Sequence, residues 1–233
     1  MKREAGSSAQ FTRRGGCEMI KYGGGAIFLA SRAERAIHLS LLAGITLLIT
    51  SCVTPDTRHH VVISIPQQRM AVLDNGALMT TYPISTSKFA IGDLPGSNGT
   101  PLGELEVAKK IGGSAPSGMV FKDRKPTGEI LVPDAPGRDP IVTRILWLRG
   151  RQAQNANAYG RYIYIHGTPE ERTIGTPASY GCIRMRSRDV IQLYDIVGPR
   201  ARVTILNGPL EAMVPALQAP VSTAGGTTSV SSH

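Results

Sequence analysis

Short strand-like segments separated by turn residues constrain the fold of this chain more than any other feature. Four of them are "HVVISI" (60–65), "RMAVL" (69–73), "VTRILWL" (142–148) and "ARVTIL" (201–206). Asp74, Asn75 and Gly76 separate the second segment from "ALMTTYPIS" (77–85), and these residues predict a hairpin turn. Short runs rich in β-branched and aromatic residues predict strands. We therefore expect a mainly β domain.

The composition agrees with strands and turns. Hydrophobic residues make up 41% of the 233 residues, enough for a core, and there are 26 glycines and 16 prolines. Residues 112–140 are dense in turn formers, with short strands expected at "MVF" (119–121) and "EILV" (129–132). The net charge is +9, but no Lys/Arg-dense run with interleaved aromatics occurs. Because such runs mark nucleic-acid binders, we expect no nucleic-acid partner.

One short helix is expected in "SRDVIQLYDIVGP" (187–199). Ser187 is the candidate N-cap, Asp189 suits the first turn, and Gly198 with Pro199 would end the helix. Helical spacing places four side chains on one apolar face: Val190, Leu193, Tyr194 and Val197. The helix would therefore pack against the strands.

An uncharged apolar run, "LSLLAGITLLIT" (39–50), predicts export. It is too short to span a bilayer but has the length of the apolar region of a signal peptide. It leads into "ITSC", which resembles a bacterial lipobox, and this resemblance implies cleavage before Cys52 and a lipid on its sulfur. The alternative is an ordinary signal peptide with a chance cysteine. Met19 is an alternative start.

These features predict a leader over 1–51 and a linker over 52–59. The mature protein would lie in the cell envelope or periplasm, held to the membrane through a lipid on Cys52. Val53 and Thr54 lack the aspartate that is associated with inner-membrane retention, so the outer membrane is favoured.

One cysteine and one histidine remain in the predicted folded body. Cys17 lies in the leader and Cys52 would carry lipid, so Cys182 has no partner for an internal disulfide. Of the five histidines, only His166 lies inside the body. An imidazole can take the proton of a thiol or stabilise the thiolate, so the pair is the minimum set for a cysteine nucleophile. Two ligands are too few for zinc unless carboxylates complete the site.

The segment "RYIYIHGT" (161–168) alternates, and this predicts a half-buried strand. One face would carry Tyr162, Tyr164 and His166, with Gly167 following at the strand end. Considered alone, His166 is better explained as a core histidine bonded to a backbone carbonyl.

Turn formers precede Cys182, which predicts a loop between that strand and the helix. Gly181 would let the backbone approach a substrate closely. The N–H groups of Tyr180, Gly181 and Cys182 are candidates for stabilising an oxyanion.

The stretch "HGTPEERTIGTPASYGCIRM" (166–185) resembles the catalytic motif of the L,D-transpeptidase (YkuD-type) family. Three more segments resemble that family in order, at 64–86, 96–105 and 143–150, so the similarity covers about 60–207. Tyr180 departs from the histidine that many members carry, and Leu105 departs from the usual aromatic residue. The resemblance implies a β-sandwich-like catalytic fold with one short helix after the cysteine. It also implies acyl transfer on peptidoglycan stem peptides without metal or cofactor.

The resemblance assigns a role to each motif residue. Cys182 would be the nucleophile, His166 the general base and later the acid, and Gly167 would orient the His166 ring through its carbonyl. Oxyanion and substrate contacts would come from Ser179, Tyr180, Gly181 and Arg184. Ser179 would fix the loop through hydrogen bonds, and Arg184 would brace the site or the peptide carboxylate. For Arg184 the alternative is an internal ion pair, and Trp147 is expected in the core.

Three other functions stay open. With water as acceptor, the protein would be an L,D-carboxypeptidase or endopeptidase. It would otherwise be a non-catalytic peptidoglycan-binding lipoprotein. A papain-like protease also uses Cys and His, but the β-rich body and the histidine before the cysteine count against it. We expect a monomer whose partners are stem peptides and the membrane. The Ala/Pro/Ser/Thr-rich segment 208–233 predicts a disordered tail.

Overall fold

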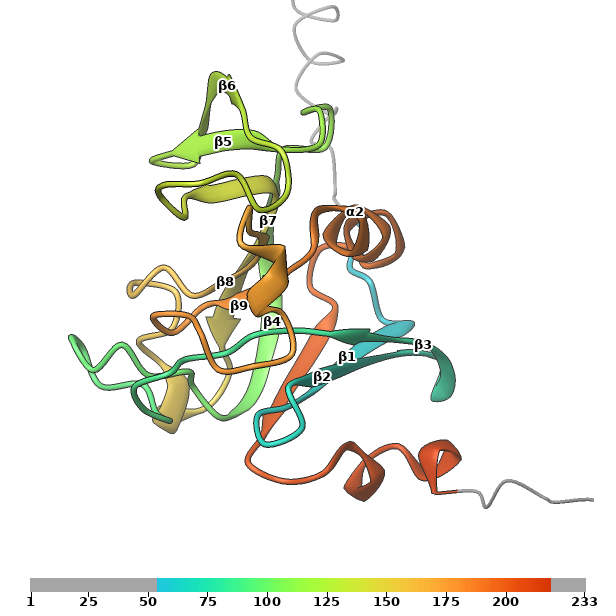
Figure 1. The fold of residues 1–233 in the computed structure, drawn as a ribbon. Helices are drawn as coiled ribbons and strands as arrows, with labels where there is room; N and C mark the ends of the chain where they lie inside the picture. The colour runs from blue at the N-terminus through green and yellow to red at the C-terminus, as the bar shows by residue number, and fades with distance from the viewer. Residues whose placement is uncertain (1–53, 219–233) are drawn as a thin grey trace, which may run out of the picture. The chain divides into compact units, whose positions relative to one another are not determined.

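Strands dominate the computed structural model, which describes residues 54–218 (Figure 1). The strands are β1 (His59–Ser64), β2 (Arg69–Asp74), β3 (Ala77–Pro83), β4 (Gly103–Ile111), β5 (Met119–Lys122), β6 (Lys125–Ile130), β7 (Ile141–Gly150), β8 (Tyr164–Gly167), β9 (Ile183–Met185) and β10 (Arg202–Leu206). Within the described residues the α-helix is α2 (Ser187–Ile196). The 3-10 helices are η1 (Ala153–Asn155), η2 (Glu171–Thr173), η3 (Leu210–Ala212) and η4 (Pro215–Leu217). The predicted mainly β class is confirmed.

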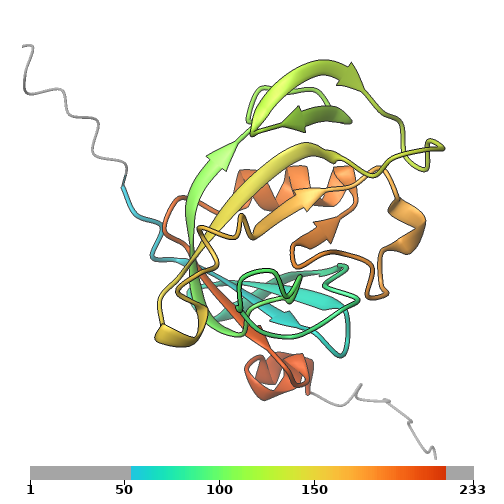
Figure 2. The same ribbon diagram turned by 90° about the vertical axis from the view of Figure 1, so that its left-hand side faces the viewer.

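All ten strands belong to one sheet, in the order β3-β2-β1-β10-β4-β7-β5-β6. β8 pairs with β7, and β9 pairs with β8. Two of these pairings are parallel, β1 with β10 and β8 with β9. Register shifts interrupt the pairing of β4 with β7 and of β7 with β8. Such irregularities bend strands, and Figure 2 shows α2 lying between the β1–β3 side of the sheet and the β7–β9 side.

The main core lies where α2 packs on the sheet. Val190 and Leu193 from the helix, and Val197 directly after it, join Val61 of β1 and Leu146 of β7 in this core. Tyr194 packs against the same cluster, so the predicted apolar face of the helix is confirmed. Burying large aliphatic side chains contributes about 1.5–3 kcal/mol each, and the helix depends on that burial because it is only ten residues long.

The predicted N-cap is wrong by one residue. Arg186 occupies the cap position and Ser187 begins the helix. The Ser187 hydroxyl lies 2.8 Å from Thr143 Oγ1, and its N–H donates to Glu171 Oε1 at 2.7 Å. The Glu171 carboxylate therefore satisfies a free first-turn amide in place of a capping serine.

Two strand predictions need correction, and one strand was missed. All residues of β8 are buried, so this strand is not half-buried, and it begins only at Tyr164. Tyr162 has a φ of 60° and lies in the preceding turn. β6 ends at Ile130, so the predicted segment 129–132 overlaps only its last two residues. β9 was not predicted, because three residues are too few to show an alternating pattern.

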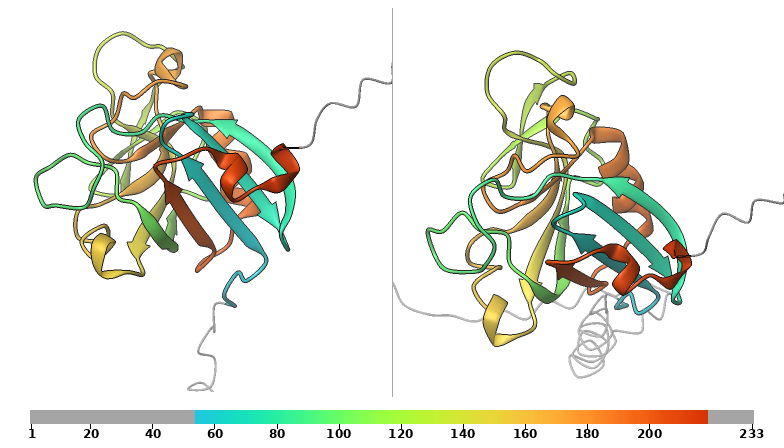
Figure 3. Two further views of the ribbon diagram at one scale, coloured as in Figure 1. Left: turned by 90° about the horizontal axis from the view of Figure 1, so that it is seen from below. Right: turned by 60° about the horizontal axis from the view of Figure 1, so that its bottom comes forward.

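Both predicted boundaries of the domain are also shifted. Asp56 accepts hydrogen bonds from His59 Nδ1 at 2.8 Å and from Gly198 N–H at 2.6 Å, so the predicted linker over 52–59 already contains residues held by the domain. At the other end, Leu210 and Val214 are buried against β1 and β2, so residues 208–218 are structured and the disordered-tail prediction is wrong there. Figure 3 shows this segment crossing the outer face of these strands.

The lipobox and leader predictions lie outside the described residues, as does the tail from 219. No helix between residues 54 and 218 is sufficiently long and apolar to cross a membrane. The buried apolar residues of this part run from Val61 to Val214, so it carries its own core and is expected to fold alone.

Leu210→Ala tests the role of the C-terminal segment. Leu210 is fully buried, so its truncation should lower the free energy of unfolding by about 2–5 kcal/mol, measured by urea denaturation. Met213→Ala is the matched control, because Met213 is 39% exposed and should cost less than about 0.5 kcal/mol. Equal effects of the two variants would show that the segment does not pack as described.

Candidate active site

The parallel pairing of β8 with β9 brings the predicted site residues together. Ile165 lies opposite Ile183, and His166 lies opposite Arg184. Side chains alternate along a strand, so Cys182, one residue before β9, lies on the same face as Arg184 and His166. The two isoleucines point the other way, into the main core. The cysteine and the histidine thus share one face of the sheet.

His166 is held in one tautomer. Its Nδ1 lies 2.8 Å from the Gly167 carbonyl oxygen, the contact that the family resemblance implies. A carbonyl only accepts, so Nδ1 carries the proton and Nε2 keeps its lone pair. Burial, with only 5% of the residue exposed, lowers the pKa of His166 to about 4, and the Arg184 charge adds to this effect. The ring is therefore a neutral base at pH 7.

Cys182 is half-buried and also neutral. Burial raises the pKa of its thiol to about 11, although the Tyr164 N–H, Arg184 and Arg161 each favour the thiolate. The Tyr164 N–H donates to the sulfur at 3.4 Å, and the thiol donates to the Tyr162 carbonyl at 3.4 Å. The free protein therefore holds a neutral thiol and a neutral imidazole on one face of the sheet rather than an ion pair.

Hydrogen bonds from Ser179 fix the loop that carries the cysteine. Its hydroxyl donates to the Cys182 carbonyl at 2.5 Å and accepts from the Gly181 N–H at 3.2 Å. The Gly181 amide is thus occupied, which corrects its expected place in the oxyanion site. Among the hydrogen bonds of the described residues, the Tyr180 and Cys182 amides donate to no acceptor.

Arg184 forms the internal ion pair that the sequence left as an alternative. Its guanidinium lies 2.5 Å from Asp139 Oδ2, and only 7% of the residue is exposed. Glu170 Oε2 lies 3.9 Å away. Because this charge is already paired within the protein, the structure supports the ion-pair alternative for Arg184 over contact with a substrate carboxylate.

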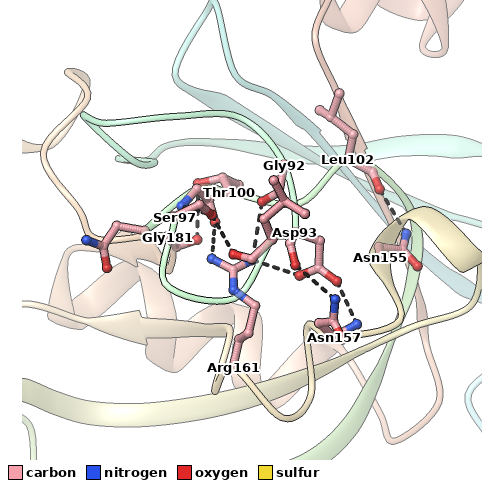
Figure 4. Close-up of polar contacts among 12 residues, drawn as sticks. Gly92, Asp93, Ser97, Thr100, Leu102, Asn155, Asn157, Arg161 and Gly181 are labelled. Carbon is pink, nitrogen blue, oxygen red and sulfur yellow. Dashed lines mark hydrogen bonds and ion pairs between the residues drawn. The ribbon is translucent and has the colours of Figure 1, made fainter.

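A polar network beside the cysteine loop was not predicted (Figure 4). Arg161 donates to Asp93 Oδ1 at 2.7 Å, to the Gly99 carbonyl at 2.8 Å and to the Gly92 carbonyl at 3.2 Å. Thr100 Oγ1 then donates to the Gly181 carbonyl at 3.1 Å. Arg161 therefore holds the 92–100 loop in place, and Thr100 joins that loop to the one that carries Cys182. The ion pair between Arg161 and Asp93 joins residues 68 positions apart, so no local sequence pattern predicts it.

Gly181 is required by this contact. Its φ is +116°, and a Cβ there would lie 3.0 Å from the Gly99 carbonyl oxygen. Both the conformation and the space exclude a side chain. Sequence reasoning gave Gly181 freedom to approach a substrate, whereas the structure shows a close approach to another loop.

Aromatic residues lie on both sides of the site. Tyr180 is 59% exposed and packs on Phe89 with ring centroids 4.9 Å apart, and Lys88 Nζ lies 5.2 Å from the Tyr180 ring centroid. Trp147 is 9% exposed and stacks on Tyr159 at 4.2 Å, so it belongs to the core as expected. Within residues 54–218, no cluster of three or more metal-ligating side chains occurs.

Comparison with known proteins places these residues in a family. The L,D-transpeptidase catalytic domain model (YkuD) matches residues 58–205. The chain is 29% identical over 175 residues to the putative L,D-transpeptidase YkuD of Bacillus subtilis (strain 168), covering 75% of this chain and 82% of that protein. It is 32% identical over 162 residues to the probable L,D-transpeptidase YcfS of Escherichia coli (strain K12), covering 67% of this chain. It spans about half of that longer relative, 47%.

Solved structures are more distant. L,D-transpeptidase 3 from Mycobacterium tuberculosis aligns with a TM-score of 0.43 and 17% identity, over 64% of this chain and 61% of that one. The sequence match is the informative comparison, since it spans more than half of the chain and includes both His166 and Cys182. The chain belongs to the L,D-transpeptidase (YkuD) catalytic domain family.

Proposed function

We propose that this protein is a cysteine-dependent L,D-transpeptidase that acts on peptidoglycan stem tetrapeptides. The observation that carries the proposal is the placement of Cys182 and His166 on one face by the β8–β9 pairing, with His166 Nε2 free to accept a proton. Membership in the family supports the same reaction.

Acylation begins from the neutral pair. His166 Nε2 takes the thiol proton as the Cys182 sulfur bonds to the carbonyl carbon between the third stem residue and the terminal D-alanine. The amides of Tyr180 and Cys182 stabilise the resulting oxyanion. His166 then protonates the amine of D-alanine, the C–N bond breaks, and a thioester remains.

Transfer follows when an amine replaces D-alanine. His166 takes a proton from the attacking amine, the new C–N bond forms, and the proton returns to the departing sulfur. One amide is exchanged for another, so the reaction needs no ATP. No cofactor takes part in these steps.

Burial of the neutral pair protects the Cys182 thiol from side reactions until the substrate arrives. A thiolate would react with any electrophile, whereas a thiol with a raised pKa reacts only when His166 removes its proton. Arg161 and Arg184 both favour the thiolate, so they stabilise the charge that develops on sulfur.

The sequence features outside the described residues complete the proposal. Cleavage before Cys52 and lipidation of its sulfur would attach the enzyme to the cell envelope, beside its peptidoglycan substrate. One acyl chain anchors only marginally, but a lipoprotein carries more than one.

Mass spectrometry of disaccharide-tetrapeptide incubated with the enzyme tests the reaction. Cross-linked dimer and released D-alanine are expected, and both should be absent with Cys182→Ala. A carbapenem should also acylate Cys182 and leave the variant unmodified. Release of D-alanine with tripeptide alone would identify a carboxypeptidase, and no turnover with any acceptor would contradict the enzymatic proposal.

The pKa of His166 makes a prediction about acid stability. Its folded pKa of about 4 lies below the unfolded value of 6.5. Above pH 6.5 the group has no effect, but as the pH falls towards 4 the unfolded chain binds a proton that the folded protein does not. His166 should therefore cost about 3 kcal/mol of stability by pH 4.

His166→Asn should flatten that loss, measured by urea denaturation at pH 7 and pH 4. The pKa of His60 is also lowered by burial, so the informative quantity is the difference between wild type and variant. Identical pH dependence of the two proteins would mean that His166 is not a buried neutral base.

Arg161→Gln tests the network beside the nucleophile. Loss of its charge and three hydrogen bonds should raise the pKa of Cys182 and loosen the loop, slowing carbapenem acylation by about 10- to 100-fold. At alkaline pH, where the thiol ionises without His166, the further rise in acylation rate should occur at a higher pH than in wild type. Arg161→Lys keeps the charge, so its pH profile should stay near wild type. A slower rate with an unmoved profile in Arg161→Gln would assign the residue to loop structure alone.

A further inference from the structure

A polar cleft lies apart from the candidate active site. It has a volume of about 740 Å³ and opens over β1, β10 and the start of β4. The candidate site is built on β8 and β9, and β7 separates these strands from β4. The basic residues that line the cleft are Arg58, Arg151, Arg200, Arg202, His59 and His60.

Strand register explains why positive side chains gather there. His60 pairs with Arg202, which pairs in turn with Glu106 on the outer face of the sheet, opposite the main core. The C-terminal 3-10 helices cover the apolar end of this face at Val62 and leave the His60 end open. The protein thus keeps an uncovered basic surface beside a covered apolar one.

Two of the arginines have no neutralising partner. Arg58 and Arg151 each lie within 3.1 Å of a carboxylate. Arg200 and Arg202 form no ion pair in the part of the chain that the structure describes, and their residues are exposed. A guanidinium group can donate two parallel hydrogen bonds to an oxyanion such as phosphate. Two unpaired guanidinium groups separated by one residue therefore suit a phosphate ligand.

The acids that line the cleft are already engaged. Asp56 accepts from His59 Nδ1 and the Gly198 N–H, and Glu104 accepts from Thr204 Oγ1 at 2.7 Å. These hydrogen bonds hold the carboxylates within the protein. The guanidinium groups of Arg200 and Arg202 are then the free partners for a ligand.

The pKa of His60 is affected by the positive charge of the cleft. Thr204 donates its proton to Glu104, so His60 Nε2, 2.7 Å away, must donate to Thr204. Burial lowers the pKa of His60, and the charge of Arg202 lowers it further. A bound anion would neutralise this charge.

We propose that the cleft binds the phosphate group of an anionic membrane lipid. We infer the lipid as ligand from the position of the cleft close to Cys52 in the chain, and this step rests on the proposed lipid anchor. Asp56 lines the cleft and lies four residues after Cys52, so an extended chain separates the cleft from an anchored cysteine by at most about 14 Å. Basic groups at that distance from a bilayer attract anionic headgroups. The cleft then acts as a second membrane contact that orients the catalytic domain.

Vesicle binding of residues 54–233, which lack the anchor, tests the cleft. Binding to phosphatidylglycerol–phosphatidylethanolamine vesicles is expected, with little binding to phosphatidylcholine. Each arginine should contribute about fivefold, so Arg200→Gln with Arg202→Gln should bind about 25-fold more weakly. Lys122→Gln with Lys125→Gln is the matched control, because it removes two exposed charges from β5 and β6, and it should bind within about twofold of wild type.

Several results would overturn the proposal. Equal losses in both double variants would mean diffuse attraction without a site. Equal binding to phosphatidylcholine would exclude recognition of anionic lipid. Saturable binding of glycerol phosphate or disaccharide-tetrapeptide without vesicle binding would assign the cleft to a soluble ligand. Unchanged carbapenem acylation in the arginine variant separates the cleft from catalysis, and radiolabelled palmitate on the full chain, lost in Cys52→Ala, reports the anchor separately.

Discussion

The parallel pairing of β8 with β9 is the contact on which the candidate site depends. It sets Cys182, His166 and Arg184 on one face and sends Ile165 and Ile183 into the core from the other. A slip of one residue would exchange these faces, burying these three polar side chains among aliphatic ones. The same register therefore buries the isoleucines, which stabilises the domain, and places the histidine and the thiol, whose burial costs free energy.

Desolvation decides the chemical state of that site. It keeps the imidazole and the thiol uncharged, while two nearby arginines favour the thiolate. Arg184 is paired with Asp139, and Arg161 with Asp93, so both arginines favour the thiolate without leaving an unpaired buried charge. The arrangement is suited to stabilising a charge that exists only during the reaction.

Patterns local in sequence were predicted well, and contacts between distant segments were not. Alternation revealed most strands, helical spacing revealed the buried face of α2, and elimination left Cys182 and His166 as the reactive pair. β9 was too short to show a period, and Leu210 and Val214 were hidden in a stretch of disorder-prone composition. Arg161 was missed because its partners come from a loop more than 60 residues away.

The neighbouring positions of β1 and β10 have a consequence for biogenesis. The first and last strands pair in parallel, His60 beside Arg202, and β10 also joins β1 to β4. The sheet therefore has a gap at its centre until nearly the whole chain has been synthesised. Contacts of such high sequence separation form slowly, so the sheet closes late in folding.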